Sequence, residues 1–168
     1  MTIYLSWRDY NKITEKIADE LKSQEFDQIV GISRSGLICA VHLSHLLGIR
    51  QFGCVGVNRT TEDKQNARKQ PATIHYTGNI NNISGKQVLV VDDIIGEGNT
   101  LDIVRKMLLK KGAHVTAAIL MANLDNYKGD NIDEIAEIIG EKVNGWVVFP
   151  WCEYSATCTV FRKTLKTG

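Results

Sequence analysis

Residues 88 to 101, VLVVDDIIGEGNTL, are the stretch of sequence that decides the fold. An apolar, β-branched run leads into two carboxylates, then a loop with two glycines, and then a helix that starts at Asn99 or Thr100. In an open parallel sheet, ligands bind beyond the carboxyl ends of the strands. We therefore expect Asp92 and Asp93 to emerge past the strand end, where a substrate would lie.

The two carboxylates and the glycine loop together suit a phosphorylated sugar. Paired carboxylates accept hydrogen bonds from two vicinal hydroxyls, or hold a Mg²⁺ that bridges them. Gly96 and Gly98 permit unusual backbone angles that let amide groups face an anion, and the next helix adds partial positive charge and the Thr100 hydroxyl. Solvated turn residues would explain the acids alone, and chance would explain the glycines alone. Their conjunction predicts a cradle for a ribose 5-phosphate group.

Two other phosphate-binding motifs do not fit this loop. A Walker A loop needs Gly-Lys before the threonine, and Asn99 stands there. A dinucleotide fingerprint needs its third glycine at the position of Leu101 and lacks the preceding acids.

Hydrophobic periodicity along the chain alternates between strands and helices. This order indicates an α/β protein with a twisted, mostly parallel sheet of about five strands flanked by helices. The pattern predicts helices over residues 7–24, 37–47 and 100–111 and strands over residues 28–33, 51–57, 88–91, 115–121 and 146–151, while residues 130–143 fit either a short helix or an extended segment. Residues 58–70 are polar and without apolar period, as expected of a flexible lid.

Composition favours a small-molecule partner. The chain has 168 residues, the size of one domain, and its 20 basic and 19 acidic residues nearly cancel. No basic stretch suggests a nucleic-acid surface, and no apolar stretch approaches the roughly 20 residues that span a bilayer. We expect a cytoplasmic protein, with no nucleic-acid or membrane partner, whose four cysteines are reduced.

Three stretches resemble type I phosphoribosyltransferases. The segment VVDDIIGEGNT looks like their signature for phosphoribosyl pyrophosphate (PRPP), and residues 29–48 are similar to the pyrophosphate-loop strand and helix of bacterial xanthine-guanine phosphoribosyltransferases, with Ser-Arg-Ser-Gly in place of Ser-Arg-Gly-Gly. WVVFPW at residues 146–151 resembles the hood of the same group. The resemblance implies one type I phosphoribosyltransferase domain over residues 1–168, with a small hood from about 1–10 and 144–168 and a flexible loop at about 58–72.

The resemblance also implies a reaction and a set of site residues. The enzyme would transfer the phosphoribosyl group of PRPP to a purine base, for purine salvage, with Mg²⁺ as cofactor. Asp92, Asp93 and Arg34 would be catalytic. Pyrophosphate would bind at Ser33, Arg34, Ser35 and Gly36, the ribose phosphate at Ile95, Gly96, Gly98, Asn99 and Thr100, the purine at Asn123, Trp146 and the Val147 backbone, and Mg²⁺ at Asp93 and Glu153.

Two positions depart from this family. Purine-specific members carry an Asp that contacts the base where this chain has Gly96, and Glu97 is a possible substitute. Asn123 stands where the xanthine-guanine group has a lysine, which leaves the preferred base open. The alternatives are a PRPP- or nucleotide-binding regulator with weak catalysis and a pyrimidine or orotate enzyme. A homodimer or homotetramer is implied by the resemblance alone.

Overall fold

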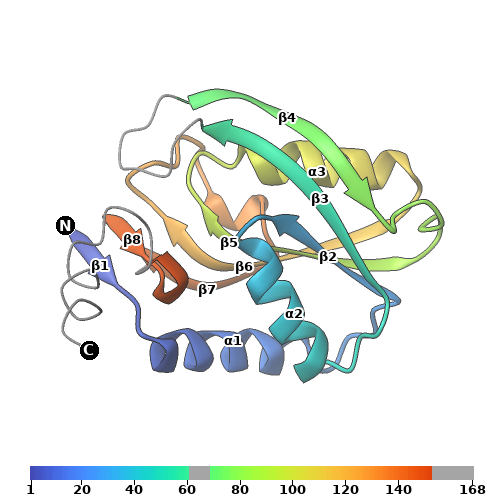
Figure 1. The fold of residues 1–168 in the computed structure, drawn as a ribbon, viewed down its shortest axis with the longest axis horizontal. Helices are drawn as coiled ribbons and strands as arrows, with labels where there is room; N and C mark the ends of the chain where they lie inside the picture. The colour runs from blue at the N-terminus through green and yellow to red at the C-terminus, as the bar shows by residue number, and fades with distance from the viewer. Residues whose placement is uncertain (61–68, 153–168) are drawn as a thin grey trace, which may run out of the picture.

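The computed structural model describes residues 1–60 and 69–152, which fold as two layers of helices around a central sheet (Figure 1). The elements follow the order β1 (Thr2–Tyr4), α1 (Trp7–Leu21), β2 (Gln28–Ser33), α2 (Gly36–Leu46), β3 (Phe52–Thr60), β4 (Lys69–Gly78), β5 (Gln87–Ile95), α3 (Asn99–Lys110), β6 (His114–Asn123), η1 (Ile132–Glu134), β7 (Ile138–Val143), β8 (Trp146–Val148) and η2 (Pro150–Cys152). The helices and strands expected from periodicity are confirmed, with ends that differ by a few residues.

The main sheet has six strands in the order β4-β3-β2-β5-β6-β7. Five of them are parallel, and β4 pairs antiparallel with β3 at the edge. The sequence did not predict β4, because an exposed edge strand can be polar and needs no continuous apolar run. The α/β class and the mostly parallel sheet are confirmed.

The expected loop at residues 58–72 is shorter in the structure. β3 continues to Thr60 and β4 begins at Lys69, and these two residues pair across the hairpin. Residues 61–68, the rest of the expected lid, lie outside the described residues. The ambiguous stretch at 130–143 resolves into η1 and β7.

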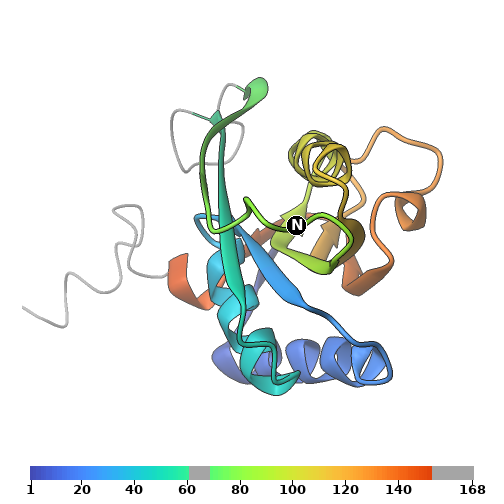
Figure 2. The ribbon, with the colours of Figure 1, turned by 90° about the vertical axis from the view of Figure 1, so that its right-hand side faces the viewer.

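Each face of the sheet is covered by its own helices (Figure 2). One core lies between the sheet and helices α1 and α2, and the other lies between the sheet and α3. The central strand β5 contributes Leu89 and Val91 to the first core and Val88 and Val90 to the second. Burial on both faces explains why this strand is a continuous apolar run rather than an alternating one.

The two ends of the described chain meet in a separate sheet of two strands. β1 pairs in parallel with β8, with Ile3 opposite Val147. The amide of Trp146 donates to the Met1 carbonyl at 2.9 Å. Gly145, with φ at +127°, is required here, because a Cβ atom would lie 2.3 Å from the same carbonyl oxygen.

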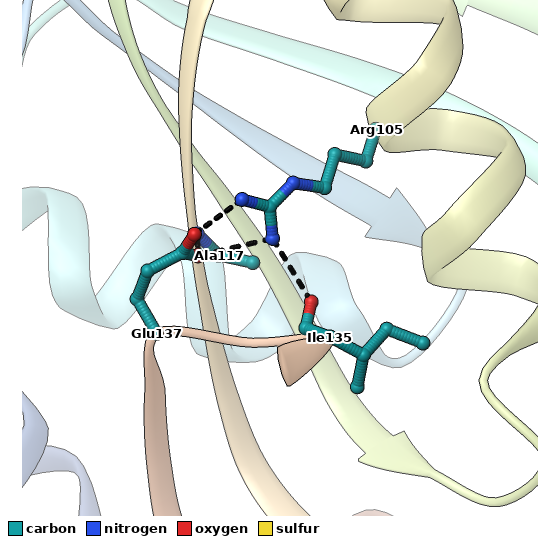
Figure 3. A network of polar contacts seen from close by, with 4 residues as sticks. All are labelled: Arg105, Ala117, Ile135 and Glu137. Carbon is teal, nitrogen blue, oxygen red and sulfur yellow. Dashed lines mark hydrogen bonds and ion pairs between the residues drawn. The ribbon is translucent and has the colours of Figure 1, made fainter. Parts of the chain in front are cut away.

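An ion pair fastens α3 to the sheet (Figure 3). The guanidinium of Arg105 donates to both carboxylate oxygens of Glu137 and, at 3.1 Å, to the carbonyl of Ile135. Glu137 also accepts the backbone amide of Ala117 at 2.7 Å. One carboxylate therefore accepts hydrogen bonds from both α3 and β6. No helix in the described part of the chain is long and apolar enough to cross a membrane.

Substitution of Glu137 by Ala is expected to lower the free energy of unfolding by about 1–3 kcal/mol, because it leaves the Ala117 amide without its acceptor and the Arg105 guanidinium with only the Ile135 carbonyl. Urea denaturation measures the loss. Lys106→Ala is the matched control, since the Lys106–Asp102 pair is a surface i,i+4 contact with the lysine side chain 73% exposed. The control should cost at most about 0.5 kcal/mol. Equal losses in both variants would contradict the assigned role of Glu137.

Candidate active site

Asp92 and Asp93 lie inside β5 rather than beyond its end. The strand continues along β6 as far as Ile95, whereas its ladder with β2 stops at Val91. The expectation that the carboxylates follow the strand end is therefore wrong by a few residues, because β6 is long enough to extend the ladder. The consequence for the site is small, because the carboxylates still lie past the last paired residues of β2 and β5, beside the end of β2.

Burial raises the pKa of both carboxyl groups of this pair. Asp92 is 8% exposed, and removal from water together with the neighbouring Asp93 charge raises its pKa well above the usual range. Desolvation also raises the pKa of Asp93 to about 6. The backbone amide of Asp93 donates to Oδ1 of Asp92 at 2.9 Å, which fixes the Asp92 side chain against the backbone of the next residue. Two desolvated like charges of this kind would be stabilised by a bound cation or by hydroxyl donors.

The turn after β2 is packed directly against the pair. A Cβ atom on Gly36 would lie 2.7 Å from Oδ1 of Asp92 and 2.9 Å from its Cα atom, so only glycine fits. The Ser35 side chain is close enough to lower the pKa of the Asp93 carboxyl, against the larger effect of burial. The peptide bond between Ser33 and Arg34 is cis, and the Arg34 side chain is exposed. The structure thus brings together two stretches that are more than fifty residues apart in the sequence.

Only one of the two loop glycines has the unusual backbone angle that the sequence suggested. Gly98 has φ at +87°, and a Cβ atom there would lie 2.5 Å from Ile135. Gly96 is not in the left-handed region, so the expectation is wrong for this residue. The nearest atom that the structure describes around a Cβ on Gly96 would be the Asn126 Cβ atom, 3.8 Å away. Gly96 therefore leaves room for a larger side chain.

The helices that start at the site differ from α1 in how they begin. α1 has a complete capping box between Ser6 and Asp9. By contrast, within the described chain, the N-cap residues Ser35 of α2 and Gly98 of α3 make no side-chain capping bond. In α2 the amides of Leu37 and Ile38 donate to the carbonyls of Arg34 and Ser35. At the start of α3 no capping side chain from the described residues takes the first-turn amides, and an anion is the partner that a helix N-terminus favours. Asn99 and Thr100 form this first turn of α3, after Ile95 ends β5.

Asn123 has structural partners that the sequence did not reveal. It is 4% exposed, its amide nitrogen donates to the Gly145 carbonyl at 2.7 Å, and its oxygen accepts from the Asp125 amide at 3.0 Å. The side chain thus ties the end of β6 to the residue before Trp146. Its contacts hold the hood strand β8 in place.

The remaining expected site residues are placed as follows. Trp146 is half-buried and Val147 is 6% exposed, both on β8. Glu97 accepts a hydrogen bond from Asn99 at 3.3 Å. Glu153 lies outside the described residues. Sequence reasoning passed over Tyr76, whose hydroxyl lies 2.5 Å from the Ser33 hydroxyl, because nothing in a polar edge strand marks one tyrosine as part of a site.

Comparison with known proteins agrees with this geometry. The family model described as "Phosphoribosyl transferase domain" matches residues 3–154. The chain belongs to the phosphoribosyltransferase family. The enzyme class predicted from the sequence is thereby confirmed at the level of the family.

Individual relatives differ in the base they are named for. A xanthine-guanine phosphoribosyltransferase from Idiomarina loihiensis is 27% identical over 154 residues, covering 88% of this chain and 85% of the relative. An adenine phosphoribosyltransferase from Vibrio vulnificus is 28% identical over 127 residues, covering 72% and 68%. The crystal structure of a purine phosphoribosyltransferase from Pyrococcus horikoshii superimposes with a TM-score of 0.75 at 26% identity, covering 92% of this chain and 96% of that one.

The raised pKa of Asp93 predicts a pH-dependent stability. Because the folded pKa of about 6 exceeds the ordinary value of 3.8, the folded state holds this proton more tightly. The stabilisation is complete below about pH 4 and is lost as the pH rises through 6. Asp93→Asn should therefore unfold at a higher urea concentration than the unsubstituted protein at pH 7.5, by about 1–2 kcal/mol without divalent cations, and the gap should close towards pH 4.

The exposed Asp130 supplies the control for this measurement. Asp130→Asn should leave the pH profile of unfolding unchanged. A profile of Asp93→Asn parallel to that of the unsubstituted protein would contradict the assigned effect of burial.

Proposed function

We propose that this protein transfers the 5-phosphoribosyl group of PRPP to a purine base, releasing a nucleoside 5′-monophosphate and pyrophosphate. The observation that carries the proposal is the contact between the turn at residues 33–36 and the carboxylates of Asp92 and Asp93. It sets a hydroxyl-binding pair against the turn that begins α2, and the uncapped start of α3 offers further amides to an anion. PRPP has matching groups: vicinal ribose hydroxyls, a pyrophosphate and a 5-phosphate.

The proposed roles follow from the chemistry of each group. The Asp92 and Asp93 carboxylates accept from the ribose hydroxyls and orient the anomeric carbon. The Arg34 guanidinium and the amides of the turn at 33–36 bind the leaving pyrophosphate. The amides from Gly96 to Thr100 hold the 5-phosphate. A ring nitrogen of the base then bonds to the anomeric carbon while the bond to the pyrophosphate oxygen breaks, and pyrophosphate leaves with the electron pair.

The donor set suits Mg²⁺ in part. Asp93 offers carboxylate oxygens next to the carboxyl group of Asp92. A hard divalent cation would offset the cost of burying their negative charge. When bound, Mg²⁺ would neutralise charge on the pyrophosphate. Among the described residues no cluster of three or more metal-binding side chains exists, so substrate oxygens would supply most of the coordination. Glu153 is carried forward as a proposed second ligand from the resemblance.

The base is proposed to bind beneath the hood, stacked on Trp146 and read by the Val147 backbone. Asn123 is not assigned to the base, because its amide already holds Gly145 and Asp125. Glu97 is kept as a weaker candidate for proton transfer. The cytoplasmic location and the homodimer or homotetramer stay predictions.

A second candidate is a PRPP- or nucleotide-binding protein with little turnover. Gly96 favours it, because the family places a base-contacting Asp at that position and the structure offers open space there. Such a protein would keep the anion sites and lose efficient catalysis.

Incubation with PRPP, Mg²⁺ and each of guanine, xanthine, hypoxanthine, adenine and uracil tests the first candidate. Chromatography is expected to show one purine nucleotide as product, and Asp92→Asn combined with Asp93→Asn should abolish its formation. Binding of PRPP by calorimetry without any product would replace the enzyme by the second candidate. If neither a product nor PRPP binding is detected, both candidates are wrong.

Gly96→Asp is expected to fold normally and to raise kcat/KM for the preferred purine by about 10-fold or more, because it restores a proton acceptor in open space. Steady-state kinetics with PRPP held at saturation measures the change. Gly96→Ala is the control: it fills the same space without a carboxylate and should give no gain. Equal rates for the two variants would show that a carboxylate at this position does not assist the reaction.

A further inference from the structure

We infer that Tyr76 positions Ser33, and through it the turn at residues 33–36 that holds pyrophosphate. This inference rests on the proposed function and assigns it one more positioning residue. Tyr76 lies on the edge strand β4, two strands away from the turn.

The sheet register places three residues in one row. Ser33 on β2 pairs with Gly56 on β3, and Gly56 pairs with Tyr76 on β4. The tyrosine ring crosses the central position of this row, because a Cβ atom on Gly56 would lie 2.1 Å from ring atom Cε1. Any other residue at position 56 would displace the ring. The glycine thus gives an edge-strand side chain access to the end of β2.

The hydrogen bonds at the end of this row assign a direction. The Ser33 hydroxyl donates its single proton to the Val55 carbonyl at 3.3 Å. Its oxygen lies 2.5 Å from the Tyr76 hydroxyl, and either hydroxyl could donate across that distance. We assign Tyr76 as the donor, because Ser33 has the Val55 carbonyl as a second acceptor for its own proton. Ser33 is held from two sides, by β3 and by β4.

The orientation has a consequence for an anion in the turn. A serine oxygen with free lone pairs aimed at pyrophosphate would repel it, whereas here a lone pair accepts from Tyr76. The turn then presents N–H groups and the guanidinium of Arg34 to the anion. Because Ser33 is the last residue of β2, fixing its side chain also fixes the start of the turn.

Packing alone does not explain this arrangement. Tyr76 is 53% exposed and belongs to neither hydrophobic core. Its ring covers a glycine, and its hydroxyl reaches a residue of the turn. Both features favour a role in the site over a role in the core.

The test combines Tyr76→Phe, Ser33→Ala and the double variant. Tyr76→Phe keeps the ring on Gly56 and removes only the donor. We expect it to weaken binding of inorganic pyrophosphate with Mg²⁺, measured by calorimetry, by about 3- to 10-fold, the range of one hydrogen bond. The KM for PRPP should rise by a similar factor while the KM for the base stays constant. In Ser33→Ala, the further change to Phe should have no effect, because the acceptor is already gone.

Thr77→Val is the matched control, since Thr77 is exposed on the same strand as Tyr76, likewise loses only a hydroxyl, and should leave all constants unchanged. If the unsubstituted protein binds pyrophosphate and Tyr76→Phe binds it equally well, the inference is wrong and the proposed function stands. Additive effects of the two substitutions, or equal rises in both KM values, also overturn the inference. If the unsubstituted protein binds neither pyrophosphate nor PRPP, the proposed function fails and the inference fails with it.

Discussion

Two carboxylates on the central strand are withdrawn from water and packed against the backbone of a neighbouring turn. Asp92 is nearly buried and lies so close to Gly36 that no side chain fits between them. Desolvation of a charge is costly unless a partner offsets it, so the arrangement stores a free-energy cost that substrate hydroxyls or a cation can relieve. Because β2 and β5 are neighbours in the sheet, the packing of the helices on these strands holds Asp92 and Gly36 together.

The surrounding architecture supports the contact from both sides. On one face α2 packs against β2 and β5, while α1 packs against β6 and β7. On the other face α3 covers the sheet, and the Arg105–Glu137 pair joins it to β6. Asn123, at the end of β6, extends this support to the hood because its amide donates to the carbonyl of Gly145, the residue before β8. The position of β8 therefore depends on the buried side chain of Asn123. A lysine at position 123 could donate to Gly145 but could not accept from the Asp125 amide.

The glycines of the candidate site fall into two groups, according to whether the surrounding structure requires them. Gly96 has ordinary backbone angles and open surroundings, so no geometric constraint requires glycine there. Gly98, Gly36 and Gly56 are each constrained, either by a positive φ angle or by a close neighbour. Geometry therefore requires glycine at positions 36, 56 and 98, whereas a side chain would fit at position 96.

The sequence by itself determined the parallel strands of the sheet, its helices and most of the residues proposed to bind anions, because these depend on local patterns: apolar runs, helical periodicity and a glycine loop after paired acids. Only the tertiary structure decided the rest. The polar strand β4, the internal partners of Asn123 and the reach of Tyr76 over Gly56 to Ser33 each depend on residues far apart in the chain. Periodicity carries no information about such contacts, since hydrogen bonds across strands are set by register and by which neighbours lack a side chain.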